Sequence, residues 1–306
     1  MAAFNLHFNG DLKVRNPRLS NPHRPLLYHA PLVIKMSQDE SYCASVTAEI
    51  EAHLKQSIPL KPPFSVFEPM HHFVFSTPRN TAPALCVAAC ELVGGDRNQA
   101  IAAASALQLM HASAFTHNQL PLTDRPKPKP ESEPKPTAHH VYNPNIELLI
   151  PDAMVPFGFE LLARSDDPAQ NNSDRILRVF VEMSRAIGSQ GMIDGQYQEF
   201  LIVQSDGRKV HDAKQISDMC QKKEGRLHAC AAACGAILGG ANEEEIEKLR
   251  SFGLYVGTIQ GISNRVQRKE GELGRMVEEY KNLAIKELEN FKEGKLDAIS
   301  SFVVGI

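Results

Sequence analysis

Hydrophobic positions along this chain recur mostly at the spacing of an α-helix. Between residues 46 and 58 an apolar side chain follows every fourth position, which predicts one buried helical face that ends before Pro59. The high apolar content of residues 83–93 predicts a second, buried helix. The Ala-rich run 100–115 predicts a third helix, whose small side chains allow close packing.

Glycine pairs and capping residues mark the ends and beginnings of these helices. Gly94-Gly95 follows the second helix, and Asp96 with Gln99 has the spacing of a capping box. The same order returns where Gly239-Gly240 precedes a second capping-box pair, Asn242 with Glu245.

Strand signals are weak throughout the chain. The strongest, Phe200 to Val203, is too short to anchor a sheet. Further helices are predicted over 146–164, 173–188, 211–238 and 270–291. The expected fold is therefore all-α, with about ten helices around a central cavity.

Two segments differ in composition from the rest. Residues 1–36 hold five basic side chains and a single acid, Asp11, with four prolines and no regular apolar period. This composition is typical of an organelle transit peptide, and an ordinary disordered tail is the alternative. Residues 125–137 are rich in proline and lysine, which favours an extended, solvated loop. Residues 37–306 are predicted to form a single helical domain.

Composition and charge argue against two classes of protein. Hydrophobic residues make up 42% and charged residues 23%, which is ordinary for a globular protein. With a net charge of −3 and no basic stripe interleaved with aromatics, nucleic acid is not an expected partner. No apolar run approaches the roughly 20 residues that cross a bilayer, so no membrane span is expected.

Four of the six cysteines form two motifs of equal spacing, Cys86/Cys90 and Cys230/Cys234. Without a secretory signal they do not indicate a disulfide framework. Cysteines at positions i and i+4 share a helix face, and with small residues between them each pair can be a close-packing patch. A four-cysteine zinc site is the alternative, although such sites usually place their pairs in loops.

Five segments resemble, in order, segments of the plant trans-isoprenyl diphosphate synthases, the family of geranyl and geranylgeranyl diphosphate synthases. They are LCVAACELVGGDRNQA at 85–100, HASAFTHNQLPLTD at 111–124, residues 139–163, SQGMIDGQ at 189–196 and KKEGRLHACAAACGAILGGA at 222–241. Because the resemblance keeps the order of these segments and extends over about residues 45–262, it implies the helical fold of that family.

Catalytic members of this family hold Mg²⁺ and an allylic diphosphate with two Asp-rich motifs, since Mg²⁺ needs anionic oxygen ligands. Where the first motif begins with two acids, this chain has Asn118 and Gln119, and only Asp124 keeps its charge. At the acidic positions of the second motif it has Asn264 and Arg265. We expect these to be degenerate former metal motifs, with no catalytic residue and no metal in this chain.

The site for the second substrate is also reduced. Family members carry Gly-Gly-Lys-Arg-x-Arg-Pro, where this chain has residues 77–83 with Arg79 as the single cation. Lys223 matches a family lysine, but Glu224 replaces the threonine beside it. Arg79 and Lys223 are the candidates for residual diphosphate contacts.

Paired Cys-x-x-x-Cys motifs mark the small subunits of heteromeric plant geranyl diphosphate synthases. The resemblance implies that the four cysteines take part in subunit interaction with a geranylgeranyl diphosphate synthase large subunit, in a heterodimer or heterotetramer. That complex would make geranyl diphosphate for monoterpene biosynthesis in the plastid stroma. Mg²⁺ would belong to the partner, and this chain would need no cofactor.

The alternative is a degenerate but active prenyltransferase that acts on its own. Its metal ligands would be Asp124, Asp152 and Glu199.

Overall fold

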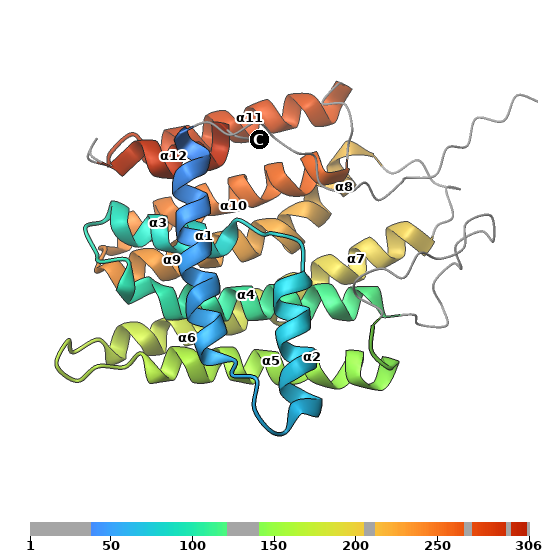
Figure 1. Ribbon diagram of the computed structural model, residues 1–306. Helices are drawn as coiled ribbons and strands as arrows, with labels where there is room; N and C mark the ends of the chain where they lie inside the picture. Colours follow the sequence, from blue (N-terminus) through green and yellow to red (C-terminus); the bar gives the residue numbers. More distant parts are fainter. Residues whose placement is uncertain (1–37, 121–140, 205–211, 266–270, 292–294, 305–306) are drawn as a thin grey trace, which may run out of the picture. The chain divides into compact units, whose positions relative to one another are not determined.

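A computed structural model describes residues 38–120, 141–204, 212–265, 271–291 and 295–304, all of which belong to the compact unit 35–306. Over these ranges the chain forms twelve α-helices, one π-helical segment and no strand (Figure 1). They are α1 (Gln38–Ser57), α2 (Phe64–Ser76), α3 (Ala82–Leu92), α4 (Asn98–Gln119), α5 (Pro144–Arg164), α6 (Ser173–Ile187), α7 (Met192–Gln204), α8 (Ala213–Cys220), the π-helical segment η1 (Gln221–Gly225), α9 (Arg226–Gly239), α10 (Glu243–Arg265), α11 (Gly271–Leu288) and α12 (Leu296–Val304). The predictions for 1–36, for the loop 125–137 and for Asp124 lie outside the described residues.

The predicted all-α fold is confirmed, and local sequence signals explain most helix ends. The four-residue period between 46 and 58 is the buried face of α1, which ends at Ser57 before Pro59. The second capping box forms in full, since Asn242 and Glu245 bond reciprocally at 2.9 and 3.0 Å. In the first, Gln99 Oε1 accepts from the backbone of Asp96 at 2.9 Å, while Asp96 Oδ1 accepts from Asn98 at 2.8 Å.

The helix α9 lies at the centre of the packing, between α3 and α10. Glycine permits both contacts, because a Cβ added at Gly235 would lie 1.9 Å from the Cys86 carbonyl oxygen of α3. On the other side, a Cβ at Gly253 of α10 would lie 2.3 Å from the His228 carbonyl oxygen. The helices α1 and α2 run across the direction of the others (Figure 1).

The structure adds detail that the sequence analysis did not predict. Phe200 to Val203, the strongest strand signal, lies in α7. The predicted helix 211–238 is divided into α8, η1 and α9, because the backbone N–H of Arg226 bonds five residues back to Gln221. The helices α2 and α12 were not predicted; α2 contains Pro69 and an aromatic-rich sequence without a clear helical period.

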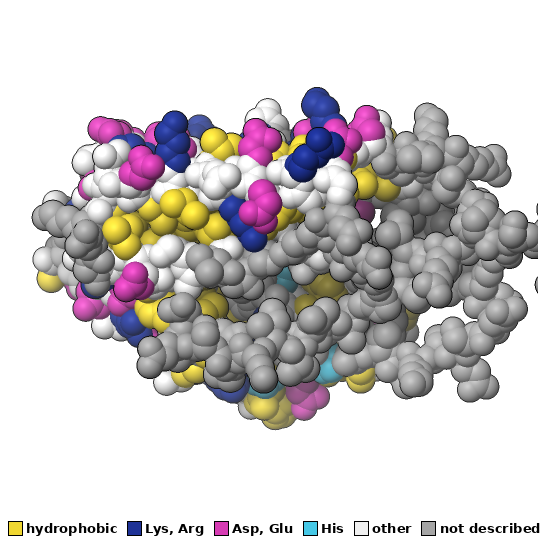
Figure 2. Space-filling view, turned by 90° about the horizontal axis from the view of Figure 1, so that it is seen from above, with side chains coloured by type: hydrophobic (Ala, Val, Ile, Leu, Met, Phe, Trp, Pro, Cys, Tyr) yellow, Lys and Arg dark blue, Asp and Glu magenta, His cyan; other side chains and the backbone are white. Residues whose placement is uncertain are grey.

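The outer helix α11 carries both acidic and basic side chains. Figure 2 looks onto the side that lies at the top of Figure 1, and it shows basic and acidic side chains next to one another with hydrophobic ones between them. None of the described helices combines the length and the apolar character needed to span a bilayer.

Candidate functional site

Four charged side chains from three elements meet at the C-terminal end of α10. We call Glu199 of α7, Lys223 and Glu224 of η1, and Arg265 of α10 the charge cluster. Arg265 Nη2 lies 2.6 Å from Glu199 Oε1 and 3.1 Å from Glu224 Oε1. Lys223 Nζ lies 2.5 Å from Glu199 Oε2 and 3.9 Å from Glu224 Oε1. The two acids and two bases sum to zero charge.

Burial and pairing act in opposite directions on these groups. Burial raises the pKa of Glu199, but the adjacent Lys223 and Arg265 outweigh it and hold that pKa below its ordinary value. Burial disfavours the charged form of Arg265, yet Glu224 and Glu199 raise its pKa further above the usual range. All four side chains are more than three-quarters buried. Pairing therefore favours the charged forms of Glu199 and Arg265, and the ion pairs compensate one another within the cluster.

The residues at this end of α10 do not fit Mg²⁺. Mg²⁺ needs several oxygen ligands with negative charge. At this position of the second motif the chain has Arg265, whose guanidinium lies between the carboxylates of Glu199 and Glu224. In the part of the chain that the structure describes, no three His, Cys, Asp or Glu side chains are placed to share a metal ion. Asn264, the other residue of the motif, precedes Arg265 in the last turn of α10.

The first two positions of the first motif lie in the last turn of α4. Asn118 and Gln119 are the final residues of this helix and are partly buried. Next to them, the ring of His117 donates from Nε2 to the Leu148 carbonyl at 3.1 Å and lies 3.4 Å from Asp152 Oδ1. Asp152 thus faces His117, while Glu199 is held by two cations. These two ligands of the alternative metal set are therefore engaged elsewhere.

The two candidates for diphosphate contacts have different surroundings. Arg79 is exposed in the connection between α2 and α3. Lys223 is paired with Glu199, so its charge is already compensated. The prediction of residual diphosphate contacts stays a prediction, and the pairing of Lys223 weakens it.

A buried chain of polar groups beside the cluster was missed by the sequence reasoning. His228 of α9 donates from Nδ1 to the Glu224 carbonyl at 2.8 Å, and its Nε2 lies 3.0 Å from Thr81 Oγ1. The same hydroxyl group lies 2.5 Å from Gln260 Nε2 of α10. The chain joins α3, α9 and α10, and these residues are 147 and 179 positions apart along the sequence, so no local pattern indicates it.

Two histidines beside this site, the buried His228 and the partly buried His111, predict a loss of stability in acid. Burial lowers the pKa of His228, and likewise that of His111, to about 4 from an ordinary value of 6.5. Between these two pH values the unfolded chain takes up protons that the native chain does not, so the free energy of unfolding falls as the pH drops from about 6.5 to 4. The fully buried His228 alone accounts for about 3 kcal/mol of that loss.

Urea unfolding followed by circular dichroism across this pH range measures the effect. In the His228→Gln variant the free energy of unfolding is expected to fall less steeply with pH, by about 1.4 kcal/mol per pH unit, which is the value for one proton. An unchanged slope would show that His228 already binds a proton in the native state.

All four cysteines of the paired motifs are buried in the contact between α3 and α9. Cys230 Sγ and Cys234 Sγ lie 3.7 Å apart, and both thiols are free. Burial raises the pKa of the Cys86, Cys90 and Cys234 thiols, so they stay protonated and unreactive. This position favours the close-packing alternative, and the role in subunit interaction stays a prediction.

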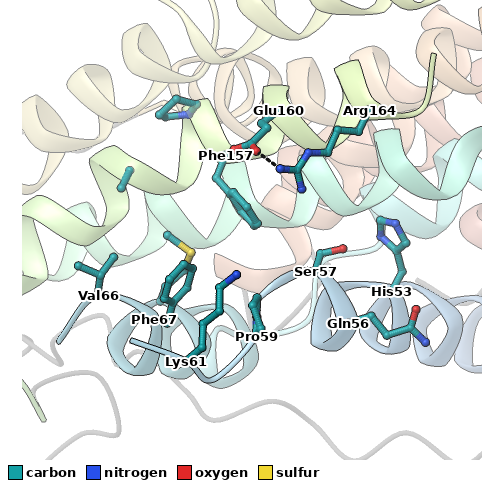
Figure 3. A pocket seen from close by; sticks show the side chains of 13 residues that line it. His53, Gln56, Ser57, Pro59, Lys61, Val66, Phe67, Phe157, Glu160 and Arg164 are labelled. Carbon is teal, nitrogen blue, oxygen red and sulfur yellow. Dashed lines mark ion pairs between the residues drawn. The ribbon is translucent and has the colours of Figure 1, made fainter. Parts of the chain in front are cut away.

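A groove of about 750 Å³ lies between the end of α1, α2 and α5 (Figure 3). Its floor includes Phe67 and Phe157, and Lys61 points into it. A cavity was predicted at the centre of the bundle, but none of the residues of the two degenerate motifs lines this groove. It is therefore separate from the charge cluster.

Comparisons with known proteins agree with this arrangement of helices and motif positions. The sequence profile of the polyprenyl synthetase family matches residues 65–263. A heterodimeric geranylgeranyl pyrophosphate synthase small subunit 2, chloroplastic, of Cannabis sativa is 58% identical over 286 residues, which are 90% of this chain and 98% of that protein.

Two solved structures are also similar. The geranyl diphosphate synthase small subunit from Antirrhinum majus is 50% identical, with a TM-score of 0.77 over 88% of this chain and all of the other. A chain of the heterotetrameric geranyl pyrophosphate synthase of mint, a deletion mutant in complex with ligands, is 48% identical, with a TM-score of 0.75 over 86% of this chain and 99% of the other.

Proposed function

The chain belongs to the polyprenyl synthetase family, and we propose that within it the chain is a small subunit that does not catalyse prenyl transfer itself. The observation that carries this proposal is the position of Arg265. A guanidinium fixed between Glu199 and Glu224 opposes a metal ion where the second motif would need acids. The amides at Asn118 and Gln119 remove two charges from the first motif.

The proposed partner is a plastid geranylgeranyl diphosphate synthase large subunit, which supplies the catalytic residues and Mg²⁺. The names of similar proteins support a heteromer and a chloroplast location. Within the chloroplast, the stroma is the location that we propose. These names differ in the product that they give. The relatives from Cannabis sativa are named for geranylgeranyl pyrophosphate, and the Antirrhinum majus subunit is named for geranyl diphosphate. We propose that this subunit directs the heteromer to geranyl diphosphate for monoterpene biosynthesis.

The surface that supports docking is formed by α5 and α6. Four large apolar side chains are exposed there, and we call them the α5–α6 surface: Leu148, Leu149, Leu177 and Val181. Phe159 of α5 stacks on Phe180 of α6 with ring centroids 5.1 Å apart, which joins the two helices. Large apolar residues exposed on two helices that contact each other are typical of a protein interface.

The paired cysteines would act on this association through packing. Because their thiols are buried between α3 and α9, a change there alters how these two helices fit rather than removing a contact with a partner. Their effect on binding is expected to be indirect.

Product analysis tests the proposal. The chain lacking residues 1–36 is expected to turn over isopentenyl and dimethylallyl diphosphates with Mg²⁺ at least about 10³-fold more slowly than its mixture with a large subunit. In the mixture the product is expected to shift to the C10 diphosphate. The Asn118→Asp/Gln119→Asp variant is expected to stay inactive by itself, because Arg265 still occupies the second motif.

Robust prenyl transfer by the isolated chain, or tight binding of Mg²⁺-diphosphate to it in calorimetry, would favour the alternative of an enzyme active by itself. An unchanged product length in the mixture would contradict the proposed effect on the partner.

A further inference from the structure

The helix α7 has its polar groups turned toward the protein and an apolar stripe turned away from it. Ile193, Tyr197 and Leu201 follow one another at every fourth position and therefore share one helix face. Their exposed fractions are 53%, 59% and 47%. We call these three residues the α7 stripe.

The opposite side of α7 is attached mainly by polar contacts. Glu199 binds Lys223 and Arg265 of the charge cluster, and Asp194 lies 2.7 Å from Lys222 Nζ. Gln196 donates from Nε2 to the Ala114 carbonyl of α4 at 3.2 Å. Among the side chains of α7 that the structure describes, Met192 is the one large apolar residue that is fully buried. Ile202 is partly buried against an apolar cluster that includes Met219 and Ile259.

This polarity is the reverse of an ordinary surface helix, which turns its apolar face to the core. Ion pairs attach α7 where apolar burial would be expected, and an apolar stripe meets water where charges would be expected. The charges beneath α7 are compensated within the chain, so an apolar surface that approaches the stripe meets no uncompensated charge. The combination is typical of a helix that is completed by contact with another chain.

We propose that the α7 stripe is a contact surface for an apolar helix face of the large subunit, and that the charge cluster positions α7 for this contact. The inference rests on the proposed function. It is supported by the position of α7, which directly follows and contacts α6, the helix that contributes Leu177 and Val181 to the α5–α6 surface (Figure 1). The heteromeric assembly of the similar mint and Cannabis sativa proteins indicates the kind of partner.

The charge cluster thereby gains a positioning role. Glu199 lies on α7 between Tyr197 and Leu201 of the stripe, and Arg265 fixes it to the end of α10. Side chains at the position of a former metal motif thus hold a binding helix in place.

The test compares the heteromer formed by the chain lacking residues 1–36 and its variants with a geranylgeranyl diphosphate synthase large subunit. Tyr197→Glu is expected to raise the dissociation constant by about 30-fold or more, as the loss of a central aromatic contact does. The matched control is Ile285→Glu on α11, where an isoleucine of similar exposure, 48%, lies on a helix outside the proposed interface. It is expected to bind within about 2-fold of the wild type.

Hydrogen exchange provides a second measurement that needs no variant. Backbone amides of 192–202 are expected to exchange more slowly in the wild-type heteromer than in the isolated chain, and amides of α11 at an unchanged rate. If the wild type binds but Tyr197→Glu binds equally well and 192–202 gain no protection, the inference is wrong and the proposed function stands. If the wild type binds no large subunit, the proposed function itself fails.

Two further outcomes overturn the inference. One is self-association of the isolated chain that Tyr197→Glu abolishes, because the stripe would then serve a second copy. The other is a Tyr197 side chain that a soluble fluorescence quencher cannot reach in the isolated chain, because the stripe would then be covered by its own polypeptide.

Discussion

Replacing Gly235 with alanine is expected to lower the free energy of unfolding by about 3 kcal/mol or more, which is a large fraction of the stability of a typical domain. The added Cβ would lie 1.9 Å from the Cys86 carbonyl oxygen and 3.0 Å from the Cys90 backbone nitrogen. Because these are backbone atoms of α3, no side chain can rotate out of the way. The helices α3 and α9 would have to separate, and the buried cysteine motifs lie in that contact.

The matched control for this variant is Gly158→Ala in α5. Gly158 is also buried within a helix, but the nearest atoms to an added Cβ are those of Ala106 at 3.4 Å. Alanine favours the helix over glycine by about 1 kcal/mol, so this variant is expected to be neutral or slightly stabilised. Urea unfolding followed by circular dichroism measures both. Equal stabilities of the two variants would show that α3 and α9 are not packed as closely as described.

Replacing Arg265 with alanine is expected to destabilise the protein by about 3–5 kcal/mol, the usual cost of removing one partner from a buried ion pair. Glu199 and Glu224 would share the single remaining cation, Lys223. The loss is expected to be smaller in mild acid, because a carboxylate without a counter-charge takes up a proton more readily.

Arg178→Ala is the control for the loss of a surface ion pair. Arg178 lies 2.5 Å from Glu243, but the two side chains are 37% and 74% exposed. Its removal is expected to cost less than about 1 kcal/mol.

A second variant separates lost pairing from lost packing. In Arg265→Met/Glu199→Gln the apolar chain is kept and the charge on both partners is removed, so most of the stability is expected to return. If the double variant is as unstable as Arg265→Ala, the loss does not come from an unpaired buried carboxylate, and the ion pairs of Arg265 themselves stabilise the fold.

Local signals were sufficient for most helices. The four-residue period of α1, the glycine pairs and both capping boxes act within a few residues of one another, so the sequence could show them without the fold. At Phe200 to Val203 local signals did not identify the helix α7, because a short apolar run has no period that separates a strand from a helix.

The residue types at the motifs were also visible in the sequence, which was sufficient to predict that Asn118, Gln119, Asn264 and Arg265 cannot replace acids as metal ligands. The partners of Arg265 were not visible, since Glu199 and Glu224 are 66 and 41 positions away from it. Their meeting depends on how α7, η1 and α10 pack.

The sequence by itself therefore determined the helical class, most helix ends and the loss of the metal motifs, because each of these depends on neighbouring residues or on one residue's chemistry. Only the tertiary structure decided that the cysteine motifs are buried between α3 and α9, that a buried ion-pair cluster lies at the end of α10, and that α7 turns an apolar stripe to solvent. These features depend on contacts between distant segments, and such contacts exist only once the helices are packed.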